Sequence, residues 1–297
     1  MVMIGLVKGL ATLVMCSLVS MGSSVGGDML PISSGSIPVS SPALMATLPA
    51  EDQVKVHFID VGQADSIYIQ LPGDDDVLID AGDVSDGETV VEYLRQQGMD
   101  GQIELLIATH PHRDHIGGIP DVLEAFDVME VLDSGLAAES RIYESYKESV
   151  LAEGCAWSAD DRQVYEFGGI ELAILTGAEE WEGVNNNSVV VRLDCGEIEF
   201  LFTGDAEKEA EEMLTGDIGA EILKVGHHGS ASSTSAEFLA RVNPEVAVIS
   251  VGEGNRYGHP HEETLARLRE NGVVASRTDI TGSLIVTTSG ELCAFIY

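Results

Sequence analysis

Cationic side chains are scarce in this sequence. It has 15 Lys and Arg against 50 Asp and Glu, which gives a formal net charge of −35 at pH 7. Non-specific nucleic-acid binding depends on Lys and Arg that neutralise phosphates, so the composition argues against that class of protein. It leaves a phosphodiester substrate open, because bound metal ions can reverse the local field of a site.

Cysteine is also rare, and no two cysteines form a CxxC pair. The sequence therefore argues against a zinc ribbon or a thioredoxin-like redox site. Cys16 lies in an apolar N-terminal stretch, and the other three, Cys155, Cys195 and Cys293, allow one disulfide but require none. Cys195 and Cys293 lie in strand-like runs, where we expect buried thiols.

The sequence lacks an apolar run long enough to cross a bilayer, which needs about 20 residues. The stretch 9–21 has about 13, the length of the apolar region of a signal peptide. We expect residues 1–22 to be a signal peptide or N-terminal anchor, and the Ser/Gly/Pro-rich residues 23–52 to be a linker. Residues 53–297 would then form the folded domain of a secreted or extracytoplasmic protein, tethered to a membrane only through its N-terminal segment.

Short apolar runs alternate with helical patterns, which indicates an α/β fold. Strands are expected near 54–61, 66–71, 77–82, 105–108, 128–132, 170–175, 189–193, 198–202, 221–225, 246–251, 273–276, 283–288 and 291–296. Helices are expected near 88–97, 119–126, 140–152, 206–214, 236–242 and 262–271. The order of elements within 127–184 does not follow from the pattern.

The stretch 109–118 concentrates the chemistry of the chain. It reads Thr-His-Pro-His-Arg-Asp-His-Ile-Gly-Gly and follows the apolar run 105–108. Three of the eight histidines, His110, His112 and His115, lie here with Asp114. Imidazole nitrogen and carboxylate oxygen are common ligands of Zn²⁺ and related ions, so the stretch predicts a divalent metal site. The alternative is a polar loop in which histidines happen to cluster.

One arrangement occurs twice along the chain. An apolar strand ends in an aspartate at Asp80 and again at Asp205, and another ends in a histidine at His110 and again at His227. Polar groups at the ends of two pairs of buried strands suggest two similar halves that meet at one site. Their sheets would pack face to face with helices outside, which predicts a four-layer αββα sandwich.

These motifs, taken in order, resemble the metallo-β-lactamase fold superfamily. Within it, the chain is most similar to the hydrolase domain of the ComEC/Rec2 family of competence proteins. The resemblance spans about 53–297 and implies a freestanding, exported relative without the polytopic channel of those proteins. Its blocks are HFIDVGQADS from His57, the 110–118 loop, Asn187-Ser188, TGDAE from Thr203, KVGHHGS from Lys224 and YGHP from Tyr257.

The resemblance implies two divalent metal ions, zinc or manganese. His110 and His112 match the ligands of a first ion, Asp114 and His115 match those of a second, and Asp205 matches the carboxylate that bridges both. Paired metal ions of this kind hold a hydroxide and clamp the attacked and leaving oxygens. The implied activity is therefore metal-dependent hydrolysis by a metal-bridged hydroxide.

Three further histidines complete the expected site. His227 matches the last metal ligand, although His228 could exchange roles with it. His259, beside Tyr257, could protonate a leaving group or hold a phosphate, or be an inert turn residue. The catalytic candidates are therefore Asp114, His228 and His259.

The chain departs from the superfamily pattern upstream of Asp205. Typical members have another histidine ligand there, whereas residues 184–188 read Val-Asn-Asn-Asn-Ser. We therefore expect the first ion to be held more weakly, or the site to prefer Mn²⁺ with more oxygen ligands.

Several other polar residues have two interpretations. Asp60 and Asp80 could orient metal-bound histidines or cap turns. Asp65 is expected to be structural or to support a ligand, and His57 to be packed or exposed. The serine-rich loop 230–235 could bind an anion or only begin a helix.

The expected substrate is a phosphodiester such as a nucleotide or DNA, including single-stranded DNA. The net charge weighs against a nuclease, so a small phosphodiester stays open. The alternatives are hydrolysis of a carboxylic ester, lactone or β-lactam on the same fold, and a non-catalytic surface binding module.

Overall fold

A computed structural model describes residues 2–6, 53–159, 162–176 and 181–297. Of the predicted signal peptide and linker, only Val2–Leu6 falls within these ranges, where it forms strand β1 at the edge of a sheet. The remainder of both segments, with Cys16, lies outside the described residues. No helix in the described ranges has the length and apolar character needed to cross a membrane.

The larger sheet has nine strands and changes from antiparallel to parallel pairing at β4. Apolar residues dominate the runs of its central strands, as expected where both faces of a sheet are covered. In spatial order the strands are β1, β18 (Leu292–Ile296), β17 (Leu284–Thr288), β2 (Val54–Phe58), β3 (Ile67–Gln70), β4 (Asp76–Ile79), β6 (Leu105–Ala108), β8 (Glu130–Asp133) and β9 (Ala156–Ala159).

The second sheet has seven strands and becomes parallel at β13. Its order is β10 (Val164–Phe167), β11 (Ile170–Ile174), β12 (Val191–Asp194), β13 (Glu199–Phe202), β14 (Ile222–Lys224), β15 (Val246–Ile249) and β16 (Val274–Arg277). A separate short parallel pair joins β5 (Gln102–Ile103) to β7 (Asp127–Val128).

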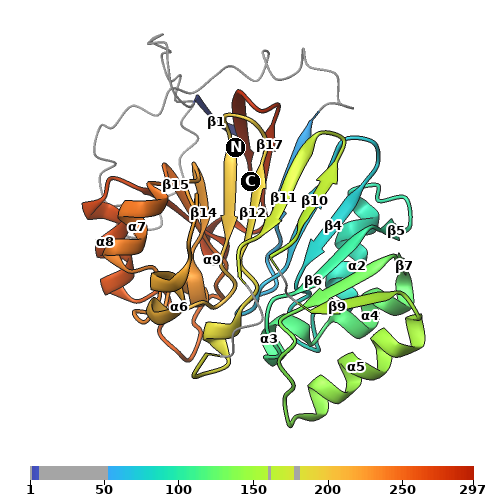
Figure 1. Cartoon of the computed structure of the whole chain (residues 1–297). Coiled ribbons are helices and arrows are strands. Elements are labelled where there is room, and N and C mark those ends of the chain that lie inside the picture. Colours follow the sequence, from blue (N-terminus) through green and yellow to red (C-terminus); the bar gives the residue numbers. More distant parts are fainter. Residues whose placement is uncertain (1, 7–52, 160–161, 177–180) are drawn as a thin grey trace, which may run out of the picture.

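Helices cover the outer faces of both sheets (Figure 1). The nine-stranded sheet is covered by α2 (Gly87–Gln96), α4 (Ile119–Ala125) and α5 (Arg141–Glu153), and the seven-stranded sheet by α6 (Lys208–Met213), α7 (Ala236–Val242) and α8 (Glu262–Glu270). Local sequence sets their limits. Ser140 caps the start of α5 by accepting from the Tyr143 N–H, and Gly154 ends it in the left-handed conformation.

The main core lies between the two sheets. Val56 and Phe58 of the larger sheet pack in one apolar cluster with Phe200 and Phe202 of the smaller one. The Phe58 and Phe202 rings lie 6.2 Å apart. Each fully buried side chain of this kind contributes about 1.5–3 kcal/mol. Separate apolar clusters join each sheet to its helices, so the predicted αββα sandwich is confirmed.

The structure also gives the order of helices and strands within 127–184, which the sequence pattern did not. The helix expected at 140–152 is α5, but the strands β9 and β10 were missed. Both lie at sheet edges, where Trp157 and Val164 are partly exposed and the apolar pattern is weak. Within the histidine-rich loop, Arg113–Ile116 forms the single helical turn α3.

Candidate metal centre

The histidine-rich loop begins where β6 ends, beside the end of the parallel strand β4. Asp80, which follows β4, accepts hydrogen bonds from the backbone N–H of Thr109 at 2.8 Å and from the Thr109 hydroxyl at 2.6 Å. The same carboxylate lies 2.7 Å from His115 Nδ1. Asp80 therefore ties the loop to the sheet and turns His115 Nε2 toward the interior of the site.

The first group of donor atoms comes from His110, His112 and Asp205, whose nearest ligand atoms all lie within 4.8 Å of one another. His110 Nε2 lies 2.9 Å from His112 Nδ1 and 3.8 Å from Asp205 Oδ2. The Ser188 hydroxyl supports both sides of this group. It lies 3.3 Å from His110 Nδ1 and accepts from the Asp205 N–H at 3.1 Å.

The second group comes from Asp114, His115 and His228, again within 4.8 Å. His228 Nε2 lies 3.5 Å from Asp114 Oδ2 and 3.7 Å from Asp205 Oδ1, while His115 Nε2 lies 3.4 Å from the same Asp205 oxygen. Asp205 therefore presents one carboxylate oxygen to each group. The resemblance implies a bridging carboxylate at Asp205, and this placement between the two groups is compatible with that role.

These donors fit divalent cations. Among the described residues, His115 Nε2, His228 Nε2 and Asp205 Oδ1 are buried without a hydrogen-bond partner. Each such atom would cost about 1–3 kcal/mol if nothing satisfied it. Donors that share a tetrahedral ion lie about 3.4 Å apart, because each bond is about 2.1 Å long. The separations of 3.4–3.8 Å around Asp205 match that spacing and exceed an ordinary hydrogen bond.

The structure places His228, rather than His227, with Asp114 and His115. His227 lies to one side, with Nε2 3.7 Å from Asp205 Oδ2, and a quarter of its side chain is exposed. Both residues have left-handed backbone angles, φ 47° and 51°, which cost about 1–2 kcal/mol each outside glycine. Such strain accumulates at functional sites. Of the two histidines between which the sequence left the choice open, His228 is therefore the one that lies in the second donor group.

A buried ion pair lies beneath His228. Lys224 is fully buried, pairs with Asp65 and donates to the Gly204 carbonyl at 3.1 Å. Burial alone would raise the pKa of Asp65, but Lys224 and His228 outweigh it and lower this pKa to about 2. His228 Nδ1 lies 3.3 Å from the Asp65 carboxylate and 3.0 Å from the Ser250 carbonyl. Lys224 was missed, although a lone cation in an apolar strand is a signal that could have found it.

Burial and neighbouring charges also shift the pKa values of the site histidines. Burial lowers the pKa of His228, but Asp205 and Asp65 raise it more, to about 10. Burial and the neighbouring His115 lower the pKa of His110 well below its usual value. The pKa values of neighbouring imidazoles within one site are thus shifted in opposite directions, because the imidazoles face different numbers of carboxylates.

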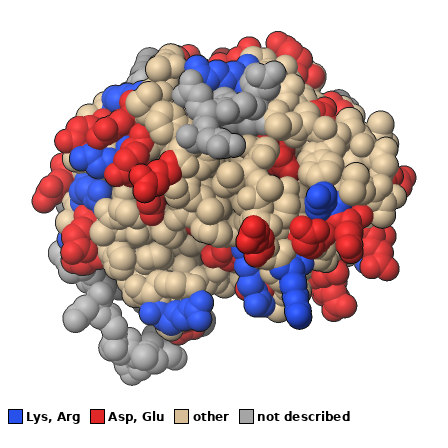
Figure 2. Space-filling view, turned by 60° about the horizontal axis from the view of Figure 1, so that its bottom comes forward, with Lys and Arg blue, Asp and Glu red and all other residues tan. Residues whose placement is uncertain are grey.

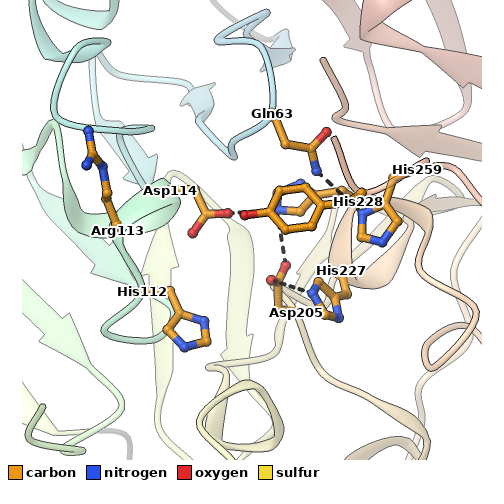
Figure 3. Close-up of a pocket in the computed structure, with 9 residues that line it drawn as sticks. Gln63, His112, Arg113, Asp114, Asp205, His227, His228 and His259 are labelled. Carbon is orange, nitrogen blue, oxygen red and sulfur yellow. Dashed lines mark hydrogen bonds and ion pairs between the residues drawn. The ribbon is translucent and has the colours of Figure 1, made fainter. Parts of the chain in front are cut away.

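The pocket over these groups has a volume of ≈ 330 Å³, and Figure 3 shows its side chains. It is lined by Gln63, His112, Arg113, Asp114, Asp205, His227, His228, Tyr257 and His259. Among the residues that the structure describes, this lining contains no aliphatic side chain. Gln63 reaches His259, with Nε2 3.5 Å from Nδ1. Burial, and then the nearby His227, lower the pKa of His259 to about 4. A neutral His259 is better suited to hold a substrate than to protonate a leaving group.

The remaining candidates separate into two kinds. Asp80 orients a site histidine, as described, whereas Asp60 accepts from the Gly62 N–H at 3.1 Å and caps its own turn. His57 is fully buried and packs against Tyr68 and Tyr93.

The serine-rich loop contacts protein atoms. Ser235 caps α7, Ser233 donates to the Ala206 carbonyl, and Ser232 donates to Glu207. The plain interpretation, a loop that begins a helix, accounts for these contacts.

The face that contains the site is not uniformly acidic, despite the net charge. Figure 2 turns this end of the molecule forward and shows a largely uncharged middle, with acidic and basic side chains around it. Arg113 lines the pocket, and Arg256 lies over the Tyr257 ring at 4.8 Å. One arginine therefore lines the pocket, and a second lies against the ring of a lining residue.

Comparisons with known proteins agree with this geometry. Residues 59–253 match the pattern of the metallo-beta-lactamase superfamily. The chain is 33% identical over 253 residues to ComE operon protein 3 of Bacillus subtilis, covering 77% of this chain and 32% of that protein. It is 32% identical over 241 residues to competence protein ComA of Neisseria gonorrhoeae, covering 79% of this chain and 32% of that one. The chain thus spans about a third of the length of these relatives.

A solved structure shows the same fold. The metallo-beta-lactamase fold protein YhfI of Bacillus subtilis aligns with a TM-score of 0.55 at 12% identity, covering 80% of this chain and all of that one. The predicted resemblance to competence proteins is confirmed over most of the chain. Fold, paired donor groups and sequence similarity agree, and the chain belongs to the metallo-beta-lactamase superfamily of metal-dependent hydrolases.

Proposed function

We propose that this protein is a divalent-metal-dependent phosphodiesterase that acts on a nucleotide or on DNA. The observation that carries the proposal is the pair of donor groups, each facing one oxygen of Asp205, at the bottom of a pocket with no aliphatic lining. Similarity to a protein named as a competence protein supports the substrate class. Bound divalent ions supply a water of lowered pKa and charge that stabilises a phosphoryl group in transfer.

The chain's own residues would position the substrate. Arg113 and Gln63 line the pocket, and the exposed Tyr257 forms part of its lining. Arginine binds phosphate through several N–H donors, and a tyrosine ring can stack on a base. Asp83 holds the Arg113 Nε at 2.6 and 2.8 Å, which leaves the outer guanidinium nitrogens for an anion.

The test is hydrolysis by protein reconstituted with Zn²⁺, Mn²⁺ or Mg²⁺. Substrates are bis-p-nitrophenyl phosphate, single-stranded and double-stranded oligonucleotides, and, for comparison, a lactone, a carboxylic ester and a β-lactam. We expect turnover of a phosphodiester with at least one metal. Failure with all three metals on every phosphodiester would contradict the proposal, and turnover of the lactone, ester or lactam alone would replace it with carbon-centred hydrolysis.

We also propose that the protein acts outside the cytoplasm. The support is the apolar stretch 9–21 and the Ser/Gly/Pro-rich segment after it. Cell fractionation of the tagged full chain, with N-terminal sequencing of the product, tests this. Recovery of the uncleaved chain from the cytoplasm alone would contradict it.

A further inference from the structure

The first donor group has fewer donors than the second. Within the described part of the chain, the first group consists of His110, His112 and Asp205, whereas His115 and His228 of the second group face Asp205 in addition to Asp114. Residues 184–188, which lie behind the first group, contain no histidine. We propose that His227 completes the first group, so that the tandem His227-His228 supplies one imidazole to each divalent ion. This rests on the same metal centre as the proposed function, but it concerns binding alone.

The distances divide the histidines between the two oxygens of Asp205. Oδ2 lies 3.8 Å from His110 Nε2 and 3.7 Å from His227 Nε2. Oδ1 lies 3.4 Å from His115 Nε2 and 3.7 Å from His228 Nε2. Each oxygen therefore faces one histidine from the 110–115 loop and one from the tandem. Figure 3 shows His227 directed toward Asp205 from the side opposite His112.

His227 is oriented as a metal-binding histidine is. Its Nδ1 lies 3.0 Å from a Glu207 oxygen, which leaves Nε2 facing Asp205. Glu207 is itself held by the Ser232 hydroxyl at 2.8 Å and by the Asn185 amide at 3.4 Å. A carboxylate on the far nitrogen fixes the tautomer and makes the imidazole a better donor. Glu207 thus does for His227 what Asp80 does for His115.

The asparagine-rich segment has a supporting role in this arrangement. Asn185 contacts Glu207, Asn186 accepts from the Glu207 N–H at 3.1 Å, and Ser188 contacts both His110 and Asp205. These contacts are made by asparagine and serine, at the place where typical members of the superfamily have a histidine ligand. The segment holds the first group from behind, and the imidazole comes from the tandem.

The backbone explains how adjacent residues can serve different ions. His227, His228 and Gly229 all have positive φ, 47°, 51° and 84°. Consecutive left-handed residues turn the chain tightly, so neighbouring side chains fan out around Asp205 instead of pointing in opposite directions as on a strand. Hydrogen bonds from the His227 N–H to the Gly204 carbonyl and from the Ser230 N–H to the His227 carbonyl hold this turn.

The competing interpretation is that His227 contacts substrate, because it lines the pocket and is partly exposed. Counting metal ions in the absence of substrate separates the two. Cobalt(II) is a suitable probe, since its visible spectrum responds to ligand number and its stoichiometry can be measured directly. The variant is His227→Asn, because asparagine tolerates a left-handed backbone.

We expect wild type to bind two cobalt ions and His227→Asn to lose one of them or to bind it at least tenfold more weakly. The double variant His227→Asn/His112→Ala should still bind one ion, because both changes affect the first group. The double variant His227→Asn/Asp114→Asn should bind none, because each group then loses a donor. Glu207→Gln should weaken the same ion 10–100-fold, and Glu209→Gln, an exposed carboxylate on α6, should change nothing.

Two results would overturn the inference. If His227→Asn bound two ions with wild-type affinity, His227 would be a substrate-contacting residue and not a metal ligand. If the double variant His227→Asn/His112→Ala lost both ions and His227→Asn/Asp114→Asn kept one, His227 would belong to the second group. Unfolding midpoints of the metal-free variants, compared with wild type, confirm that each is folded. A chain that binds two ions as expected but cleaves no phosphodiester would contradict the proposed function and leave this inference standing.

Discussion

Asp205 shows how much a single residue decides in this protein. It is almost fully buried at the end of β13, and its carboxylate lies between two sets of imidazole nitrogens. Burial raises the pKa of Asp205, but His115 and His228 lower it more strongly, well below its usual value. The residue therefore keeps its negative charge, which is what a ligand shared by two cations needs.

We predict that Asp205→Ala removes activity more completely than His259→Ala. Asp205 faces both donor groups, whereas His259 lies at the pocket wall beside Gln63 and Tyr257. A loss of about 10³-fold or more in kcat/KM with reduced metal content is expected for the first. About 10–100-fold with full metal content is expected for the second, because a hydrogen bond to a charged group contributes about 1.5–3 kcal/mol and each 1.4 kcal/mol is tenfold. Equal losses with unchanged metal in both variants would show that these roles are wrong.

The ion pair of Lys224 with Asp65 gives a second prediction at this scale. Lys224→Met would leave Asp65 buried without its cation, which costs about 3–5 kcal/mol when one partner is removed. Denaturant unfolding of metal-free protein measures this cost. The double variant Lys224→Met/Asp65→Asn should recover part of it, because no buried charge is left alone. A single variant within about 1 kcal/mol of wild type would mean that the pair is unimportant for folding.

At the scale of elements, the site depends on close approach between segments. Gly118 begins α4 beside the chain that follows β4. A Cβ atom there would lie 2.2 Å from the Ala81 carbonyl oxygen and 2.8 Å from the Gly87 Cα. Both are backbone atoms, which cannot move aside as a side chain can. This contact fixes where α3, with Asp114 and His115, lies against the sheet.

We predict that Gly118→Ala lowers the free energy of unfolding by about 1–3 kcal/mol, the usual cost of overpacking. It should also weaken metal binding, because α3 and α4 must shift together. Gly219→Ala is the matched control, since its added Cβ would meet only an Asp217 side-chain oxygen at 3.3 Å. Unfolding curves and cobalt titrations of both variants make the comparison. If the two variants had the same stability and metal affinity, α4 would be able to move enough to accommodate the added Cβ atom at little energetic cost.

Asp76 in the β3–β4 hairpin should make the free energy of unfolding depend on pH. Burial raises the pKa of Asp76 to about 7, although Tyr68 donates to its carboxylate at 2.8 Å. Between about pH 4 and pH 7 the folded state then binds more protons than the unfolded state, so stability falls as pH rises through this window. Asp76→Asn should remove that loss. It should be more stable than wild type by on the order of 2–4 kcal/mol at pH 8, since one pKa unit is about 1.4 kcal/mol.

Unfolding curves of wild type and Asp76→Asn from pH 4 to pH 8 check this slope. Asp127→Asn is the control, because Asp127 is an exposed aspartate on β7 that is not among the charges acting on Asp76. A constant stability difference between wild type and Asp76→Asn at all pH values would contradict the assignment.

At the scale of the whole molecule, the site joins the two halves. Its donors come from the loop that follows β6 in one sheet and from the ends of β13 and β14 in the other. Cations bound there would cross-link the sheets at the edge of the core. A chelator should therefore lower the unfolding midpoint of the whole domain and not only the activity.

We predict that removal of both ions lowers the unfolding midpoint by about 10–20 °C, that is about 5–10 °C per ion. Each ion at 100 times its dissociation constant adds about 2.7 kcal/mol, and in a domain of this size 1 kcal/mol corresponds to about 2–4 °C. Thermal unfolding with and without chelator measures it. The shift should return on adding metal and be absent in Asp205→Ala. An unchanged midpoint would mean that the ions bind without stabilising the fold.

Much of this could be predicted from the sequence. Apolar runs with polar ends are local features, so most strands, the fold class and the concentration of histidine and aspartate at strand ends followed from residue order, and the resemblance supplied the ligand roles. The edge strands β9 and β10 did not, because exposed strands carry a weaker apolar pattern. Asp60 and Asp80 looked alike in sequence, and only their neighbours show that one caps a turn while the other orients His115.

The sequence by itself determined that imidazoles and carboxylates gather at the ends of buried strands, because residue type and apolar period are written along the chain. Only the tertiary structure decided which atoms face one another. His227 and His228 are adjacent in sequence, yet a left-handed turn directs them to different oxygens of Asp205. Lys224, Asp65 and Glu207 gain their roles from contacts between distant segments. Such contacts depend on backbone geometry and packing in three dimensions, which no local pattern contains.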